Sequence, residues 1–178
     1  MNTYIALFRG INVGGKHLLP MKELVATLIT LGFEGIRTYI QSGNVVLKSK
    51  RKCSVKEGGS IASAVEARVG FRPEVLLLDA PEFKEAIVHN PYDTTIGKAL
   101  HFFFLKSMPL APDLPRLESL RSPSEQFTLN GKVLYLSAPD GIGRSKLGAA
   151  VERSMGTTVT ARNWNTVSKL LEMIEEPS

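Results

Sequence analysis

The sequence contains a single cysteine, Cys53, which excludes an internal disulfide bond. One free thiol is typical of a reducing compartment, so we expect a cytoplasmic protein. Long apolar runs are missing as well: runs such as Phe102–Leu105 are far shorter than the about 20 residues of a membrane helix. The first residues also lack a cationic segment followed by an apolar one, which is the pattern of a secretory signal. We therefore expect no membrane partner.

Histidines are scarce, and none of them suggests a metal site. His17, His89 and His101 do not have the spacing of metal ligands. His101 begins an apolar strand, where a packed histidine is the expected interpretation. The sequence therefore predicts no metal, and it identifies no other cofactor.

Positive charge is present in modest excess. The chain has 22 Lys and Arg against 17 Asp and Glu, a formal net charge of +5, which mildly favours anionic partners. The one basic cluster, between Lys48 and Lys56, is interpreted as a solvated loop between a strand and a helix. With 178 residues, of which 43% are hydrophobic, the chain is long enough for one medium domain or two small ones.

Hydrophobic periodicity predicts the same order of elements, βαββαβ, twice along the chain. In the first half we expect strands at Thr3–Phe8, Ile36–Gln41, Val45–Ser49 and Glu74–Leu78, with helices at Pro20–Leu31 and Ser60–Val69. In the second half we expect strands at His101–Lys106, Gln126–Leu129, Lys132–Ser137 and Thr158–Ala161, a helix at Asp113–Arg121, and another marked by Leu147, Ala150, Val151 and Met155. A connecting helix near Pro81–His89 and a closing helix at Asn163–Glu175 complete the pattern.

This order indicates an α+β protein made of two tandem ferredoxin-like (βαββαβ) units with a C-terminal helix. We expect one half at residues 1–80, a connecting helix and loop at 81–99, and the second half with the closing helix at 100–178, all forming one compact unit. In such a unit the turns after the first strand, between the middle strands and before the last strand lie at one end of the sheet. Gly10–His17, Gln41–Asn44 and Phe71-Arg72 should therefore converge. In the second half, Asp140–Lys146 should approach Arg162–Thr166.

Four ordered motifs resemble those of a known bacterial family, domain of unknown function 1697. They are Arg9–Lys16 (RGINVGGK), Tyr39–Val45 (YIQSGNV), Gly143–Leu147 (GRSKL) and Arg162–Val167 (RNWNTV), and Asn90-Pro91-Tyr92 resembles a further element of the family. The resemblance implies a compact α+β fold with two ferredoxin-like halves, and it implies no activity. The chain departs from the family pattern at His17, Ala161 and Leu78-Asp79.

The first motif reads as Gly-x-x-x-x-Gly-Lys, like a phosphate-binding loop, but His17 stands where that loop needs Ser or Thr. Leu18, Leu19 and Pro20 follow, so Lys16 is expected in the loop rather than on the helix. The alternative interpretation is that Gly14-Gly15 simply permits a tight turn. Gln41–Asn44 is likewise interpreted first as a hairpin turn, a role that does not exclude ligand contact.

The segment Asp140–Lys146 is the better anion candidate, because two glycines precede a helix whose first turn holds Arg144, Ser145 and Lys146. Cations in the first turn of a helix oppose the helix dipole. Two interpretations of these cations stay open: they have a function in binding an anion, or they are solvated residues of the surface. Asn163 is a candidate helix N-cap. Arg162 and Asn165 have no structural explanation from sequence.

The motif cores contain no Asp, Glu or Cys, which removes the usual groups of acid–base catalysis and of cation sites. Ser145 has no recognisable base beside it, so no catalytic residue is identified. The side chains that the four motifs do contain are hydrogen-bond donors and cations, which are suited to recognising an anion. The expected ligand-binding residues are Arg9, Asn12, Lys16, Gln41, Ser42, Asn44, Arg144, Ser145, Lys146, Arg162, Asn163 and Asn165.

Three hypotheses follow from these patterns. In the first, a small phosphate-bearing or nucleotide-like anion is held between the two motif clusters. In the second, RNA binds on a ferredoxin-like sheet, with Tyr4, Phe8 and Tyr39 as possible stacking residues, although the usual aromatic RNA-binding motif is absent. In the third, the motifs specify turns in a structural or interaction protein.

Overall fold

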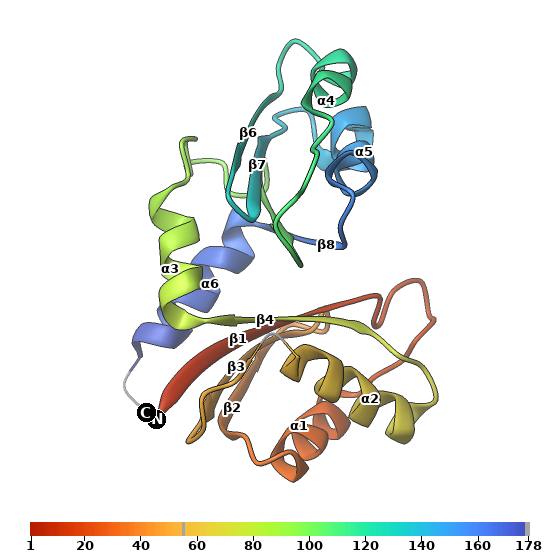
Figure 1. Ribbon diagram of the computed structural model, residues 1–178, viewed down its shortest axis with the longest axis vertical. Coiled ribbons are helices and arrows are strands. Elements are labelled where there is room, and N and C mark those ends of the chain that lie inside the picture. The colour runs from red at the N-terminus through yellow and green to blue at the C-terminus, as the bar shows by residue number, and fades with distance from the viewer. Residues whose placement is uncertain (55, 177–178) are drawn as a thin grey trace. The chain divides into compact units, whose positions relative to one another are not determined.

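The computed structural model describes residues 1–54 and 56–176, and its contacts divide the chain into two units. One unit comprises Met1–Glu85 together with the chain from Leu170 onward, and the other comprises Ala86–Lys169. Each unit contains a four-stranded antiparallel sheet (Figure 1). The described residues thus form an α+β protein with six α-helices.

The first unit repeats the predicted element order. Its strands are β1 (Asn2–Arg9), β2 (Glu34–Tyr39), β3 (Asn44–Ser49) and β4 (Glu74–Asp79), and its helices are α1 (Met21–Thr30) and α2 (Glu57–Val69). The strands lie in the order β2-β3-β1-β4. Both helices cover the same face of the sheet (Figure 1), where the alternate strand residues Phe8 and Val45 pack with Leu24 and Ile61 in one core. Burial of these side chains is the main stabilising contribution to the unit.

The second unit has the same order of elements. Its strands are β5 (Leu100–Leu105), β6 (Gln126–Asn130), β7 (Val133–Ser137) and β8 (Val159–Asn163), and its helices are α4 (Leu114–Leu120), the short 3-10 helix η1 (Ile142–Arg144) and α5 (Lys146–Met155). The strand order is β6-β7-β5-β8, equivalent to that of the first sheet. Phe103 and Leu134 on the sheet pack with Leu117 of α4 and Val151 of α5. The two units are therefore similar in pattern.

The remaining helices, α3 (Ala80–Val88) and α6 (Trp164–Glu175), each cross a boundary between the units. The end of α6 belongs to the first unit: the guanidinium of Arg37 donates to the Met173 carbonyl and pairs with Glu176 at 2.8 Å. Glu175 of α6 also pairs with Lys84 of α3 at 3.2 Å. Helix α3 thus begins in the first unit and ends in the second, and α6 runs from the second unit into the first. Periodicity marks an apolar stripe on a helix but does not say which sheet it covers.

Helix α2 begins at Glu57, three residues before the expected Ser60. The sequence Gly58-Gly59 looks like a helix breaker because glycine has low helix propensity. In the structure, a Cβ on Gly58 would lie 2.5 Å from the carbonyl oxygen of Val75. The missing side chain therefore lets the first turn of α2 contact the backbone of β4. At α1, Pro20 is the N-cap rather than the first helical residue, a shift of one position.

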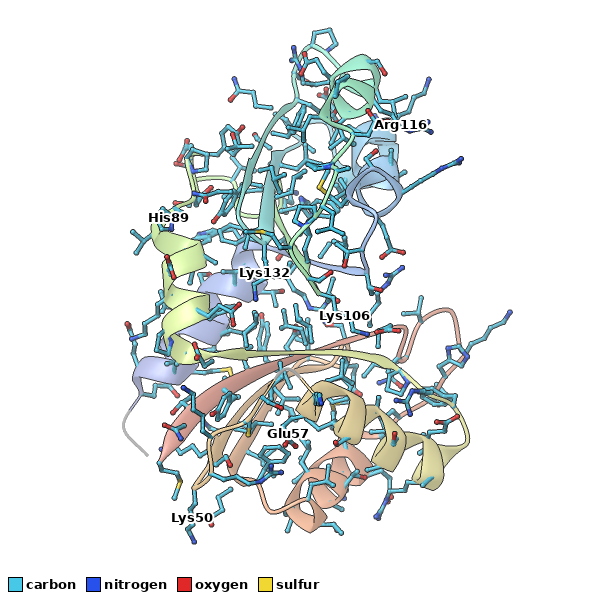
Figure 2. The ribbon with its side chains drawn as sticks, in the orientation of Figure 1. Lys50, Glu57, His89, Lys106, Arg116 and Lys132 are labelled. Carbon is cyan, nitrogen blue, oxygen red and sulfur yellow. The ribbon has the colours of Figure 1, made fainter. Side chains whose placement is uncertain are left out.

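Two cations of the basic segment after β3 pair with carboxylates. Lys50 pairs with Glu34 at 2.8 Å, and Arg51 pairs with Glu57 at 2.5 Å; Figure 2 shows Lys50 and Glu57 on this unit. Each partner raises the pKa of its cation, and Arg51 lowers the pKa of Glu57. The interpretation of this segment as a solvated loop fits these surface pairs.

His101 is buried in β5, and its burial should make the stability of the second unit depend on pH. It is 7% exposed, and its Nδ1 has no hydrogen-bond partner among the described residues. Burial lowers its pKa below the ordinary 6.5, against a smaller opposing effect of a backbone hydrogen bond at Ala99. In the window between that lowered pKa and 6.5, the unfolded chain takes up a proton that the folded chain does not. The free energy of unfolding should therefore fall as the pH falls through this window.

The measurement is the thermal midpoint of the wild type and of His101→Gln from about pH 8 down to about pH 5. The variant removes the titrating group, so its midpoint should fall less steeply below pH 6.5. An equal fall in both proteins would assign the acid sensitivity to other groups.

Candidate functional site

The loop of the first motif is a miniature β-hairpin. Val13 and Lys16 form an isolated bridge, with the Lys16 N–H donating to the Val13 carbonyl at 3.0 Å. Gly14 and Gly15 between them have φ values of +57° and +71°. Two consecutive residues with positive φ are the requirement of a type I′ turn, which glycine satisfies. The tight-turn interpretation of Gly14-Gly15 is confirmed, and Lys16 lies in the loop ahead of α1.

Asn12 holds this loop in place with its whole side chain. Its Nδ2 donates to the carbonyls of Leu19 (3.0 Å) and Gln41 (2.8 Å), and its Oδ1 accepts the Leu19 N–H at 2.8 Å. The residue has a φ of +52°, a conformation that asparagine tolerates better than most residues. The predicted ligand-binding residue Asn12 therefore has a structural role that occupies both of its donors.

The second motif also uses its asparagine internally. Asn44 is fully buried, and its Nδ2 donates to the Tyr39 carbonyl at 3.2 Å and to Ser42 Oγ at 3.0 Å. These bonds fix the turn between β2 and β3. The backbone of Gly43 in turn accepts the Phe8 N–H at 2.8 Å, which ties the turn to β1.

The predicted convergence of three segments at one end of the first sheet is confirmed. Asn12 bonds to Gln41, and the ring of His17 stacks on Phe71 with centroids 4.7 Å apart. The side chains of Lys16 and Gln41 are exposed at this end. Arg9 is exposed as well, and it stands opposite Glu74 in the strand register, a favourable charge arrangement.

In the second unit, the third motif builds the N-terminus of α5. Ser145 is the N-cap, and its Oγ accepts the Gly148 N–H at 2.8 Å. A cavity of about 340 Å³ adjoins this helix end. It is lined by Leu120, Ser122, Glu125, Asp140, Gly141, Arg144, Ser145 and Lys146.

The cavity carries charges of both signs. Arg144 and Lys146 are exposed, and neither forms an ion pair with another described residue. Glu125 is 4% exposed and accepts the Ser122 N–H at 2.9 Å, whereas Asp140 is exposed and accepts a hydrogen bond from Ser124 Oγ at 2.5 Å. The sequence motifs had not pointed to Glu125. It comes from the loop between α4 and β6, which no local spacing connects to the third motif.

The fourth motif does not join this cavity. In the register of β8, Arg162 stands beside Phe102, on the sheet face opposite to Phe103 and α5. Burial lowers the pKa of the Arg162 guanidinium to about 10, so the side chain remains charged at neutral pH. Asn163 is the predicted N-cap of α6, since its Oδ1 accepts the Thr166 N–H at 3.1 Å.

Asn165, the last predicted residue, is exposed and lies against Gly97. Because neither Arg162 nor Asn165 lines the cavity, the expected approach of Asp140–Lys146 to Arg162–Thr166 does not produce a shared site within this unit.

Of the three aromatic residues considered for RNA stacking, two are buried, whereas Tyr39 is half-buried. Tyr4 is 4% exposed and Phe8 is 1% exposed, and both belong to the core under α1 and α2. Tyr135 and Phe102, on the second sheet, are also buried and pack edge to face with centroids 4.9 Å apart. Stacking of bases on a sheet requires accessible rings.

Two features are absent from the part of the chain that the structure describes. No group of three or more His, Cys, Asp or Glu residues is arranged to hold a metal ion there. Among those same residues, no helix combines the length and apolar character needed to cross a membrane.

Comparison with known proteins identifies one family and a similar solved structure. A family described as protein of unknown function (DUF1697) matches residues 1–135. The structure of the conserved bacterial protein SP0830 from Streptococcus pneumoniae is similar, with a TM-score of 0.72 and 25% sequence identity over 98% of this chain and 99% of that one. No curated protein matches the sequence. Since the family match spans most of the chain, the protein belongs to the DUF1697 family of proteins of unknown function.

Proposed function

We propose that this protein binds a small anionic ligand, bearing a phosphate or similar group, in the cavity at the N-terminus of α5. The observation that carries the proposal is the pair Arg144 and Lys146, which line the cavity and make no ion pair with a described residue. The first backbone N–H groups of a helix have no partner inside the helix and favour an anion. Two cations placed against this dipole are unfavourable alone, and a bound anion removes the conflict.

The proposal is one of recognition without a reaction. Ser145 is 6% exposed, and its hydroxyl oxygen is engaged in capping Gly148. The cavity is lined by neither histidine nor cysteine, the side chains that most often serve as the base or the nucleophile of a catalytic site. A cavity that offers hydrogen-bond donors in fixed positions is suited to holding an anion.

A thermal-shift comparison with inorganic phosphate, nucleotides and phosphorylated metabolites tests the proposal. The wild type should gain about 2.7 kcal/mol of stability at a ligand concentration of about 100 times Kd, and Arg144→Ala/Lys146→Ala should gain little. The matched control is Lys98→Ala/Arg116→Ala, which removes two exposed cations of the same unit away from the cavity. If no anion stabilises the wild type, or if both double variants respond equally, the proposal is wrong.

We also propose that each unit is ferredoxin-like and that the protein works in the cytoplasm. The strand orders β2-β3-β1-β4 and β6-β7-β5-β8, with two helices on one face, support the first statement. The presence of a single cysteine supports the second.

A further inference from the structure

The cavity beside α5 contains a buried carboxylate that an anion site does not need. Glu125 lies directly before β6 and is 4% exposed. Two bonds hold its segment: the Ser122 N–H donates to its Oε2 at 2.9 Å, and Arg121 Nη1 donates to its backbone carbonyl at 2.9 Å. The position of this carboxylate is therefore set by the fold rather than by solvent.

The second carboxylate oxygen of Glu125 has no hydrogen-bond partner among the described residues, and the residue lines the cavity. The nearest guanidinium in sequence, that of Arg121, is paired with Glu118 at 2.7 Å, and its charge also attracts that of Glu125 without a hydrogen bond to the carboxylate. Arg144 and Lys146 line the same cavity without pairing with it. No described side chain donates a hydrogen bond to that second oxygen, so an ammonium group that arrives through the cavity would be stabilised there as a directly bonded partner.

We propose that the ligand of this cavity is amphoteric, with an anionic group held by Arg144 and Lys146 and an ammonium group held by Glu125. The inference rests on the proposed function and names the class of ligand for that site. Two cations and two carboxylates line the cavity, so their formal charges cancel, which matches a ligand that carries both signs. A volume of about 340 Å³ is at the small end of ligand sites and suits a metabolite of a few heavy atoms between its charges.

Asp140 is the second carboxylate of the lining, and it differs from Glu125 in two ways. It is exposed to solvent, and its Oδ2 accepts a hydrogen bond from Ser124 Oγ at 2.5 Å. Water screens an exposed charge, so the attraction of Asp140 for a ligand cation is weaker. The ammonium group is therefore assigned to Glu125.

Calorimetric titration of the full chain with matched probes tests the inference. The probes are ethyl phosphate against phosphoethanolamine, and propyl phosphate against 3-aminopropyl phosphate, so that each pair differs only by the ammonium group. For at least one pair, the wild type should bind the amine about tenfold more tightly, because a buried carboxylate–ammonium pair forms. In Glu125→Gln this preference should fall to about onefold while the plain alkyl phosphate still binds. Asp140→Asn is the control and should keep most of the preference.

The outcomes separate the two proposals. If the alkyl phosphates bind in a manner that depends on Arg144 and Lys146 but neither amine is preferred, the amphoteric ligand is excluded and the anion site stands. If the preference survives in Glu125→Gln, the assignment of the ammonium to Glu125 is wrong. If no phosphate probe binds and no anion stabilises the wild type, both proposals fail. The comparison of probes on the wild type decides the inference even where the variant does not fold.

Discussion

Replacement of Asn12 by aspartate should destabilise the first unit by about 2–3 kcal/mol. The substitution keeps the shape of the side chain and the Oδ1 that accepts the Leu19 N–H. It removes both hydrogen bonds donated by Nδ2, to the carbonyls of Leu19 and Gln41, each worth about 1 kcal/mol. It also places a negative oxygen against those two carbonyl oxygens, which adds repulsion.

Chemical denaturation with a linear extrapolation measures this loss. Asn130→Asp is the matched control, because it introduces the same charge at an exposed residue of β6. Its unfolding free energy should stay within about 0.5 kcal/mol of the wild type. An unchanged stability in Asn12→Asp would show that the loop does not depend on its asparagine.

Alanine at Gly58 should destabilise the protein, whereas alanine at the adjacent Gly59 should stabilise it. Both residues lie in the first turn of α2, where alanine is normally favoured over glycine by up to about 1 kcal/mol. At Gly58 the new Cβ would lie 2.5 Å from the Val75 carbonyl oxygen, while at Gly59 no atom lies within 4 Å. Because the clashing atom belongs to the backbone of β4, relief requires the helix to move, at a cost of about 1–3 kcal/mol.

The two variants differ by one position and have the same composition, so the difference between their unfolding free energies isolates the contact. We expect Gly59→Ala to raise the unfolding free energy by about 0.5–1 kcal/mol and Gly58→Ala to lower it. Equal effects of the two substitutions would mean that α2 does not rest on β4 through Gly58.

Local patterns were sufficient for the element order, because each element carries its own periodicity. Strand β5 and helix α5 appear where the apolar spacing of their residues predicts them. Helix α2 begins three residues before the expected Ser60; Gly58 in its first turn has low helix propensity, and the contact that compensates for it comes from Val75 on another strand. Helix propensity is a property of the single residue, so it carries no information about a contact with another strand.

The lining of the cavity beside α5 combines residues that are neighbours in sequence with one that is not. Arg144, Ser145 and Lys146 are neighbours in sequence, so their spacing sufficed to group them. Glu125 faces the same cavity from a different loop, and its burial depends on the folded unit. Arg162 was expected beside them, but its register with Phe102 places it on the other face of the sheet. A change of one residue in register changes the face, and local sequence does not fix the register.

Three motif residues, Asn12, Asn44 and Ser145, form hydrogen bonds within the protein. These bonds affect how loss-of-function variants should be interpreted. A cell that carries a change at Asn12, Asn44 or Ser145 would contain less folded protein, because each side chain bonds to its own backbone surroundings. Proteolysis would then lower the amount of protein, and the resulting phenotype would resemble a defect in ligand recognition. Changes at Arg144 and Lys146, which make no ion pair with a described residue, should leave abundance intact. The functional defect of each variant should therefore be expressed relative to its measured protein level. This normalisation separates the residues that maintain the fold from those that contact a ligand.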